Sequence, residues 1–222
     1  MTRTYCFWHT LSKIVARLFL SLRVIHPERM VEVGPVILAS NHQSFCDPPL
    51  VGICSRRDVH YLARKTLMDV PFLGGLLPRI NVIPVDRDGN DMSALKTIIR
   101  LVRGGNGVVL FPEGTRSPDG RLGKGKPGIG LIIAKTGAPV QPMRIFGAHK
   151  AFPKGSGFTP SPVTVVIGEP IRFTPDELDP ASWGGDERAL YQGLSDRVME
   201  AIADLRLPES LPSGEGAERL DG

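Results

Sequence analysis

The stretch that most clearly indicates a fold class in this 222-residue chain is VILASNHQSFCDPP, residues 36–49. Its first four residues are apolar, which predicts a short buried strand. The polar run 40–47 then predicts a loop, and residues 47–49, Asp-Pro-Pro, predict the start of a helix, because Asp is a good N-cap and Pro suits the first helical position. A buried strand that leads through a loop into a helix is typical of an α/β domain, whose loops carry functional side chains.

The rest of the chain continues this alternation of strands and helices. Further strands are predicted at residues 59–63, 80–85, 108–111, 139–146 and 163–167. Amphipathic or buried helices are predicted at residues 92–102, 129–135 and 190–205. We therefore expect a single α/β domain over residues 28–207, with a mixed, largely parallel central sheet flanked by helices. The tail 208–222 is rich in Pro, Ser, Gly and Glu, which predicts disorder.

An amphipathic helix is predicted at residues 5–25, within an N-terminal segment 1–27. Its apolar face, at 3.6-residue spacing, comprises Phe7, Leu11, Ile14, Val15, Leu18, Phe19, Leu22 and Ile25. Lys13 and Arg17 lie on the far side, and such cations interrupt every window long enough to span a bilayer. Two interpretations remain, a helix packed on the domain core and a helix lying in the membrane interface.

Composition narrows the class of partner. The net charge of +4 and the pI of about 9.1 favour anionic partners, but no tight Lys/Arg run with interleaved aromatics is present, so we expect no nucleic acid partner. The three cysteines form no CxxC pair and no metal-type cluster, which suits a reducing compartment. The first 25 residues lack a small-residue cleavage site, so no secretory signal is expected.

The loop after the first predicted strand carries a candidate base. A histidine titrates near neutral pH and can take a proton from an alcohol, and a nearby carboxylate can orient the ring through its other nitrogen. His42 and Asp47 are separated by four residues in a strand-to-helix turn, which can bring the two side chains together. The alternative, favoured by spacing alone, is that Asp47 caps its helix and His42 is an ordinary loop residue.

A second polar loop, Phe111 to Ser117 with the sequence FPEGTRS, also follows a predicted buried strand. Gly114 allows a close backbone approach, and Arg116 offers a rigid fork suited to phosphate. Glu113 could accept from a substrate hydroxyl or orient Arg116. The alternative is a solvated turn whose surface ion pair contributes little.

Together the two loops resemble the first and third signature blocks of the glycerolipid acyltransferase family, which includes the 1-acyl-sn-glycerol-3-phosphate and glycerol-3-phosphate acyltransferases. That family carries Asn-His-(four residues)-Asp before Phe-Pro-Glu-Gly-Thr-Arg-Ser, and both blocks occur here in order. Its second block, Gly-x-Ile-x-x-x-Arg, resembles residues 81–87 with Asn81 in place of Gly, and its fourth resembles residues 140–145 more loosely. In residues 63–67, Arg64 stands where the family usually has a phosphate-binding Lys.

The resemblance implies roles for individual residues. His42 would be the general base and Asp47 its orienting carboxylate. The acceptor's glycerol phosphate would be held by Arg64, Arg87, Glu113, Gly114, Thr115 and Arg116, with Lys126 contacting the phosphate or the carrier. The implied reaction moves a fatty acyl group from acyl-CoA or acyl carrier protein to the sn-2 hydroxyl of 1-acyl-glycerol-3-phosphate, giving phosphatidic acid. No metal or other cofactor is expected, because the thioester supplies a good leaving group.

Three alternatives stay open at this point. The acceptor could instead be glycerol-3-phosphate, another lysophospholipid or an amino-acid-based lyso-lipid. A thioester hydrolase or esterase could act through Ser44 or Cys46, and a third possibility is an inactive lipid-binding module. The membrane habit of the family favours the interfacial interpretation of the N-terminal helix, so we expect peripheral or monotopic association with the cytoplasmic face of a membrane.

Overall fold

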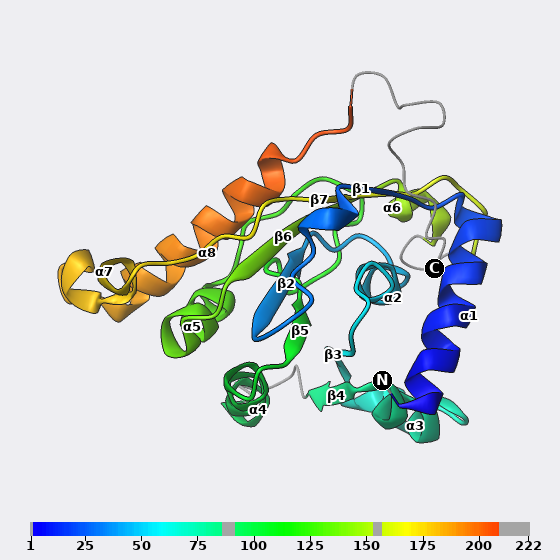
Figure 1. The fold of residues 1–222 in the computed structure, drawn as a ribbon, viewed down its shortest axis with the longest axis horizontal. Helices are drawn as coiled ribbons and strands as arrows, with labels where there is room; N and C mark the ends of the chain where they lie inside the picture. Colours follow the sequence, from blue (N-terminus) through cyan, green and yellow to red (C-terminus); the bar gives the residue numbers. More distant parts are fainter. Residues whose placement is uncertain (1, 86–91, 153–156, 209–222) are drawn as a thin grey trace.

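The structure is a computed structural model that describes residues 2–85, 92–152 and 157–208. Its centre is a seven-stranded sheet with the strand order β1-β7-β6-β2-β5-β3-β4 (Figure 1). The strands are β1 (Arg23–Ile25), β2 (Val36–Ser40), β3 (Val59–Arg64), β4 (Val82–Val85), β5 (Gly107–Leu110), β6 (Val140–Phe146) and β7 (Thr164–Ile167). The strands predicted from sequence are all present, with bounds that differ by one or two residues.

The sheet is mixed and largely parallel, as predicted. Strands β6, β2, β5, β3 and β4 run in one direction, while β7 pairs antiparallel with β6 and parallel with β1. Ala39 of β2 lies opposite Leu110 of β5. Because these parallel neighbours end at the same edge of the sheet, the loops that follow them open side by side.

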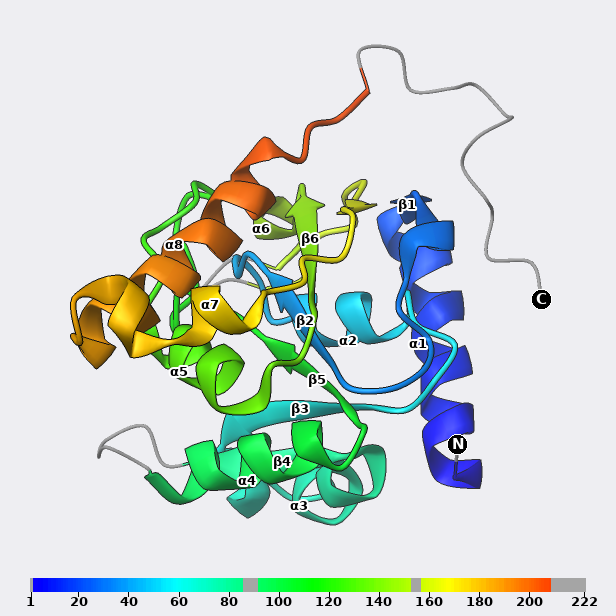
Figure 2. The same ribbon diagram turned by 60° about the vertical axis from the view of Figure 1, so that its left-hand side comes forward.

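Helices cover both faces of the sheet (Figures 1 and 2). The longer ones are α1 (Arg3–Leu20), α2 (Asp47–Gly52), α4 (Met92–Arg103), α5 (Pro127–Thr136) and α8 (Glu187–Asp204). Successive residues of β2 point to opposite faces, so Val36 and Leu38 pack with α1 and α2, whereas Ile37 and Ala39 pack with α4, α5 and α8. The result is a three-layer α/β/α domain.

Short helical segments join these elements. They are the α-helices α3 (Leu73–Leu76), α6 (Ala148–Ala151) and α7 (Pro175–Leu178), and the 3₁₀ segments η1 (Pro27–Arg29), η2 (Lys65–Asp69), η3 (Leu77–Ile80) and η4 (Pro180–Trp183). None of them was predicted, because a single turn is too short to display a helical period. Residues 209–222, for which we predicted disorder together with Pro208, lie outside the described residues.

The predicted N-terminal helix 5–25 is wrong at its C-terminal end. Helix α1 stops at Leu20, and Ser21 adopts a left-handed conformation with its amide bonded to the Ala16 carbonyl. Arg23–Ile25 form strand β1, which pairs with residues 164–166 of β7. Val24 and Ile25 fit either a helical stripe or a strand, and the pairing with a segment about 140 residues away decides for the strand.

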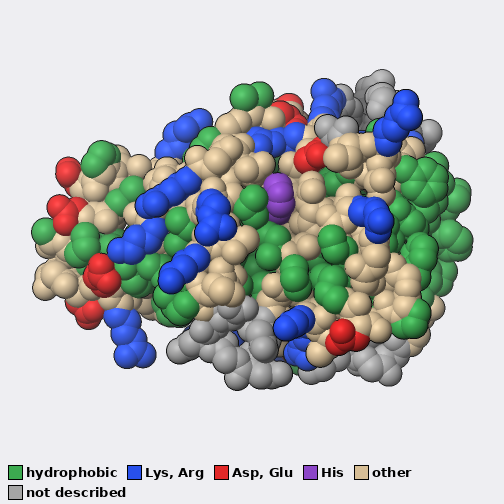
Figure 3. Space-filling model, turned by 90° about the horizontal axis from the view of Figure 1, so that it is seen from below, with side chains coloured by type: hydrophobic (Ala, Val, Ile, Leu, Met, Phe, Trp, Pro, Cys, Tyr) green, Lys and Arg blue, Asp and Glu red, His purple; other side chains and the backbone are tan. Residues whose placement is uncertain are grey.

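Helix α1 turns its predicted apolar face outward. The residues that it buries are Tyr5, Ala16 and Leu20, whereas Phe7 is 61% exposed and Leu18 is 72% exposed. Figure 3 shows hydrophobic side chains covering the right-hand end of the molecule, where Figure 1 places α1. No helix in the described part of the chain is both long and apolar enough to span a membrane. Packing against the domain core therefore does not explain why this face of the helix is apolar.

Candidate active site

The loops that follow β2 and β5 are joined at His42. The backbone N–H of His42 donates to Oε1 of Glu113 at 2.9 Å, and its carbonyl accepts from the N–H of Ser117 at 2.7 Å. Residues 41–46 and 111–117, far apart in sequence, therefore form one site at the carboxyl edge of the parallel strands.

The side chains of His42 and Asp47 meet inside this site. Nδ1 of His42 lies 2.8 Å from Oδ2 of Asp47, which also accepts from the backbone N–H groups of Gln43 and Ser44 at 2.6 Å each. Because the carboxylate accepts, Nδ1 carries the proton, and Nε2 is left as the proton acceptor. The ring stacks on Phe111 with centroids 4.1 Å apart, which fixes its plane. The pair has the geometry of a base and its orienting carboxylate.

Asp47 is not the N-cap that the sequence suggested. Helix α2 begins at Asp47 itself, and its capping position is Cys46, which makes no side-chain hydrogen bond. Pro48 and Pro49 have no N–H to offer, and the N–H of Leu50 donates to the Cys46 carbonyl. The Asp47 carboxylate therefore turns back to the preceding loop, where it is fully buried against His42.

Glu113 joins the two loops through their backbones. Its side chain is 5% exposed, and Oε2 accepts from the N–H of Gly123 at 2.9 Å while Oε1 accepts from His42. Burial raises the pKa of this carboxyl, and the two amide bonds oppose that shift. Since both oxygens already accept backbone bonds, the geometry does not support Glu113 as the residue that orients Arg116. Its contact with an acceptor hydroxyl stays a prediction.

Arg116 is the cation beside this pair, and one of its nitrogens is buried and unpaired among the described residues. Its guanidinium lies over the ring of Phe45, 3.5 Å from the centroid, and its buried Nη1 has no hydrogen-bond partner among the described residues. Burial and, second, the neighbouring Arg64 lower the pKa of Arg116. A buried donor that the protein leaves unpaired is a position where an anion gains charge-assisted hydrogen bonds.

The other predicted binding residues differ in how they are placed relative to His42 and Arg116. Arg64, at the end of β3, and Thr115 line the same cavity as His42 and Arg116. Gly114 has a φ of +67°, and a Cβ there would lie 3.0 Å from the side chain of Lys126, so Lys126 extends across this glycine. Arg87 lies outside the described residues.

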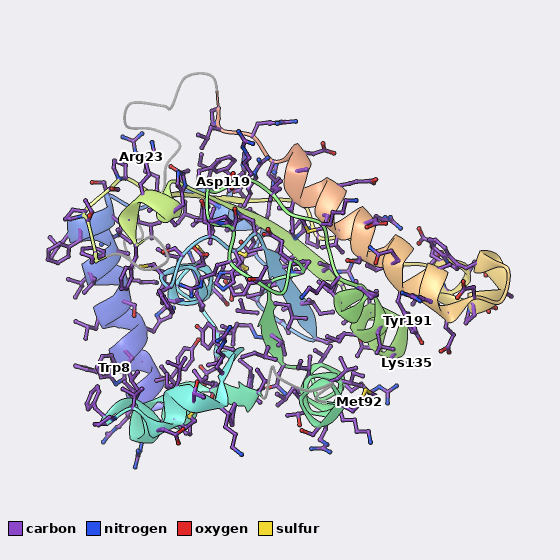
Figure 4. All side chains as sticks on the ribbon, turned by 180° about the vertical axis from the view of Figure 1, so that it is seen from behind. Trp8, Arg23, Met92, Asp119, Lys135 and Tyr191 are labelled. Atoms are coloured by element: carbon purple, nitrogen blue, oxygen red, sulfur yellow. The ribbon has the colours of Figure 1, made fainter. Side chains whose placement is uncertain are left out.

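An apolar cavity of about 540 Å³ opens from the His42 side chain. Its walls come from α1, α2, β3 and η3, and the N-terminal half of α1 contributes Tyr5 and Trp8. The hydroxyl of Tyr5 bonds to that of Tyr61 at 3.1 Å, which ties α1 to β3. Trp8, labelled in Figure 4, reaches from α1 toward α3, where its ring lies 6.0 Å from that of Phe72. Sequence reasoning missed this wall, because nothing local links these residues to His42.

Two polar side chains beside His42 also escaped prediction. The amide of Asn41 donates to the Ile145 carbonyl at 2.9 Å and accepts from the Ile145 N–H at 2.7 Å, which fastens the end of β2 to β6. Gln43 accepts from Nδ1 of His149 at 2.9 Å. The position of Asn41 in the motif was a signal that could have identified it, whereas His149 carries no such signal in the sequence.

The geometry disfavours a nucleophilic route through Ser44 or Cys46. Ser44 is fully buried, and its hydroxyl donates to the Phe152 carbonyl at 3.2 Å, away from His42. Burial raises the pKa of the Cys46 thiol, which keeps it in the weakly nucleophilic protonated form. Neither residue has the environment of an activated nucleophile.

Known proteins resemble this chain in sequence and in fold. A chloroplastic 1-acyl-sn-glycerol-3-phosphate acyltransferase from Brassica napus is 36% identical over 141 residues, which are 62% of this chain and 41% of that protein. A 1-acyl-sn-glycerol-3-phosphate acyltransferase from Bacillus subtilis is 29% identical over 204 residues, covering 88% of this chain and 96% of the relative. The chain thus spans about two fifths of the plant relative and nearly all of the bacterial one.

Among solved structures, the 1-acyl-sn-glycerophosphate (LPA) acyltransferase PlsC from Thermotoga maritima has a TM-score of 0.68 and 26% identity, covering 92% of this chain and 83% of that one. The family model described as Acyltransferase matches residues 21–146, well over half of the chain. That segment contains β2, β5, the His42–Asp47 pair and the Arg116 loop. This chain belongs to the acyltransferase family.

Proposed function

We propose that this protein is a 1-acyl-sn-glycerol-3-phosphate O-acyltransferase. It moves a fatty acyl group from an acyl thioester, carried by coenzyme A or acyl carrier protein, to the sn-2 hydroxyl of lysophosphatidate and forms phosphatidate. The observation that carries the proposal is that two groups line one apolar cavity: His42, which Asp47 orients, and Arg116, whose buried Nη1 has no hydrogen-bond partner among the described residues. The names of the similar proteins from Brassica napus and Bacillus subtilis support lysophosphatidate as the acceptor.

In the proposed reaction, Nε2 of His42 accepts the proton of the acceptor hydroxyl while that oxygen attacks the acyl carbonyl carbon. The tetrahedral intermediate collapses, the carbon–sulfur bond breaks, and His42 returns the proton to the departing thiolate. Asp47 stabilises the imidazolium between the two transfers. General-base assistance of this kind contributes about 10²–10⁴-fold. No metal or cofactor takes part, because the thioester is already activated.

The acceptor phosphate is held by the cationic wall of the cavity. Arg116 and Arg64 both line it, and a dianion between two guanidinium groups gains charge-assisted hydrogen bonds from both. The stack on Phe45 keeps the plane of Arg116 fixed, so less entropy is lost when phosphate binds. Arg87, Gly114, Thr115 and Lys126 are further candidates for this contact.

The outward apolar face of α1 supports association of the protein with a membrane. Its exposed apolar side chains favour burial among lipid chains, and a helix in this orientation lies in the interface without crossing it. We place the protein at the cytoplasmic face as a peripheral or monotopic protein, in keeping with its cysteines, which form no disulfide in the described structure.

An acceptor panel tests the proposed function. Purified protein is given labelled acyl-CoA or acyl carrier protein with lysophosphatidate, glycerol-3-phosphate, lysophosphatidylcholine or an amino-acid-based lyso-lipid. Labelled phosphatidate is the expected product, and release of free fatty acid without lipid product would overturn the proposal. His42→Ala should lower turnover by about 10²–10⁴-fold. The matched control is His26→Asn, a surface histidine with a φ of +60° that Asn tolerates, which should remain active.

A further inference from the structure

A connected row of four phenylalanines leads from α1 to the candidate active site. We name Phe19, Phe158, Phe152 and Phe45 the aromatic row. Neighbouring ring centroids lie 6.0 Å apart for Phe19 and Phe158, 6.3 Å for Phe158 and Phe152, and 5.4 Å for Phe152 and Phe45. At its inner end the row reaches the guanidinium of Arg116, which lies over Phe45.

The aromatic row is open to the surroundings. Phe19, Phe45 and Phe158 are 47%, 52% and 44% exposed, and Phe152 is partly buried. Single exposed apolar side chains are ordinary on a protein surface, but a contiguous apolar surface marks an interaction site. This surface joins an outward-facing apolar helix at one end and the Arg116 guanidinium at the other, whose buried Nη1 has no partner among the described residues. Its chemistry is therefore that of an amphiphile with one anionic end.

The aromatic row and the apolar cavity share Phe45 and extend from it in different directions. Phe45 lines the cavity and also begins the row. From there the cavity extends to Tyr5 and Trp8 in the first half of α1, whereas the row reaches Phe19 near its end. Trp8 and Phe19 are about 16 Å apart along the helix axis. Two separate apolar surfaces therefore leave one cationic centre.

We infer that the aromatic row holds the acyl chain that the acceptor already carries, while Arg116 holds the acceptor's phosphate. This inference rests on the proposed function, in which two acyl chains must be near His42 at once. The transferred chain has its carbonyl at His42 and enters the apolar cavity, so the acceptor chain needs a second apolar surface. The acceptor class is then a single-chain anionic lipid, and glycerol-3-phosphate lacks the part that the row recognises.

The outer end of the row explains how such a lipid arrives. Phe19 belongs to the exposed apolar face of α1 that we place in the membrane interface. A lysolipid moving along the row keeps its chain in contact with apolar groups, while its phosphate approaches Arg116. The acceptor therefore reaches His42 without passing its chain through water, which would cost free energy for every exposed methylene.

The test compares acceptors that differ only in chain length. Steady-state kcat and KM are measured for hexanoyl, octanoyl, decanoyl and dodecanoyl lysophosphatidate, each below its aggregation concentration and without vesicles. For a half-buried chain we expect KM to fall about twofold per added methylene. Phe158→Ser should abolish most of this dependence. Phe158→Leu, which keeps an apolar side chain, should retain much of it.

A matched control separates the row from general membrane binding. Phe7 is another exposed phenylalanine on the outward face of α1, and Phe7→Ser leaves the row intact. Both serine variants are expected to bind anionic vesicles less well, but only Phe158→Ser should change the chain-length dependence in the vesicle-free assay. Thermal unfolding of each variant checks that the fold is retained.

The outcomes are distinct. An unchanged chain-length dependence in Phe158→Ser overturns the inference, and weaker vesicle binding alone would then assign the row to membrane contact. Equal use of glycerol-3-phosphate and lysophosphatidate also overturns it, although the proposed acyl transfer would stand. If wild-type protein acylates no acceptor in the panel, the proposed function itself has failed.

Discussion

The two loops that build the candidate site are held in very different ways. In the loop after β2, the backbone amides of His42, Gln43 and Ser44 all donate to buried carboxylates, and the side chains of these residues are almost inaccessible. The loop after β5 spans residues 111–126 and exposes Arg121, Lys124 and Lys126 to solvent. The protein's own hydrogen bonds therefore hold the base in position, whereas the loop after β5 keeps cations available for a ligand.

The second loop is anchored to the first at a few points. Glu113 accepts from His42 and Gly123, and Ser117 donates to the His42 carbonyl. The N–H of Lys126 donates to the Pro112 carbonyl and closes the loop. Losing the bond between Glu113 and His42 should therefore displace the base, while removing the Arg116 guanidinium should mainly affect binding of the ligand.

The largest expected effect concerns the buried loop. Asp47→Asn replaces an acceptor of three hydrogen bonds by an amide that can present N–H to His42, which favours the wrong tautomer. We expect kcat to fall by about 10³–10⁴-fold, measured under saturating acceptor. The matched control is Asp119→Asn in the other loop, which accepts from Ser117 and Arg121 and should stay near wild type. Comparable losses of kcat in both variants would contradict the claim that Asp47 in particular positions the base.

A smaller effect is expected for the cationic loop. Arg116→Ala removes the guanidinium stacked on Phe45, and the loss of one or two charge-assisted bonds to phosphate should lower kcat/KM for lysophosphatidate by about 10–10³-fold, mainly through KM. Arg121→Ala removes an exposed cation of the same loop, whose side chain is 90% exposed, and should have little effect. A loss in kcat with unchanged KM would show that Arg116 acts on the chemistry.

A still smaller change in activity is expected for Glu113, which anchors one loop to the other. Glu113→Gln keeps one acceptor oxygen and loses the other, so either His42 or Gly123 loses its bond. We expect kcat to fall about tenfold with the acceptor KM nearly unchanged, because a displaced base reacts less often but phosphate still binds. A rise in KM at constant kcat would instead indicate that Glu113 contacts the acceptor.

The smallest effect is a pH dependence of stability. Burial raises the pKa of Glu113 in the folded state above its unfolded value, so the native protein binds more protons in the window just above that unfolded value. The stability contributed by this group is therefore present at lower pH and is lost as pH rises through the folded pKa. We therefore expect the unfolding midpoint of wild type, relative to that of Glu113→Gln, to fall as the pH rises. A difference in unfolding midpoint that does not change with pH would contradict the raised pKa of Glu113.

Local sequence patterns predicted much of this domain. The apolar runs predicted at residues 36–39 and 108–111 correspond to the buried strands β2 and β5, of which β5 ends at Leu110, and the alternation of strands and helices indicated the mixed α/β sheet. The spacing of His42 and Asp47 permitted their contact, but it equally permitted an N-cap. Pro48 and Pro49 leave Leu50 as the next residue with an N–H, and the structure shows that this N–H donates to the Cys46 carbonyl and not to Asp47.

Other features depend on contacts between distant segments. The period of residues 5–25 revealed an apolar stripe but could not say whether it faced the sheet or the outside, and it did not reveal that Arg23–Ile25 leave the helix to pair with β7. The bonds of Glu113 to His42 and Gly123 likewise required the loops to be placed side by side. Periodicity reports that one face differs from the other, and only packing selects which of them is buried.

Strand formation and motif spacing are local properties, so the residues alone indicated the chemical groups of the site and the strands that lead to them. Which surfaces those groups share depends on how the chain packs. The cavity beside Tyr5 and Trp8 and the row from Phe19 to Phe45 join residues from opposite parts of the chain. Parallel strands are connected through long crossovers, so their neighbours in space are not neighbours in sequence.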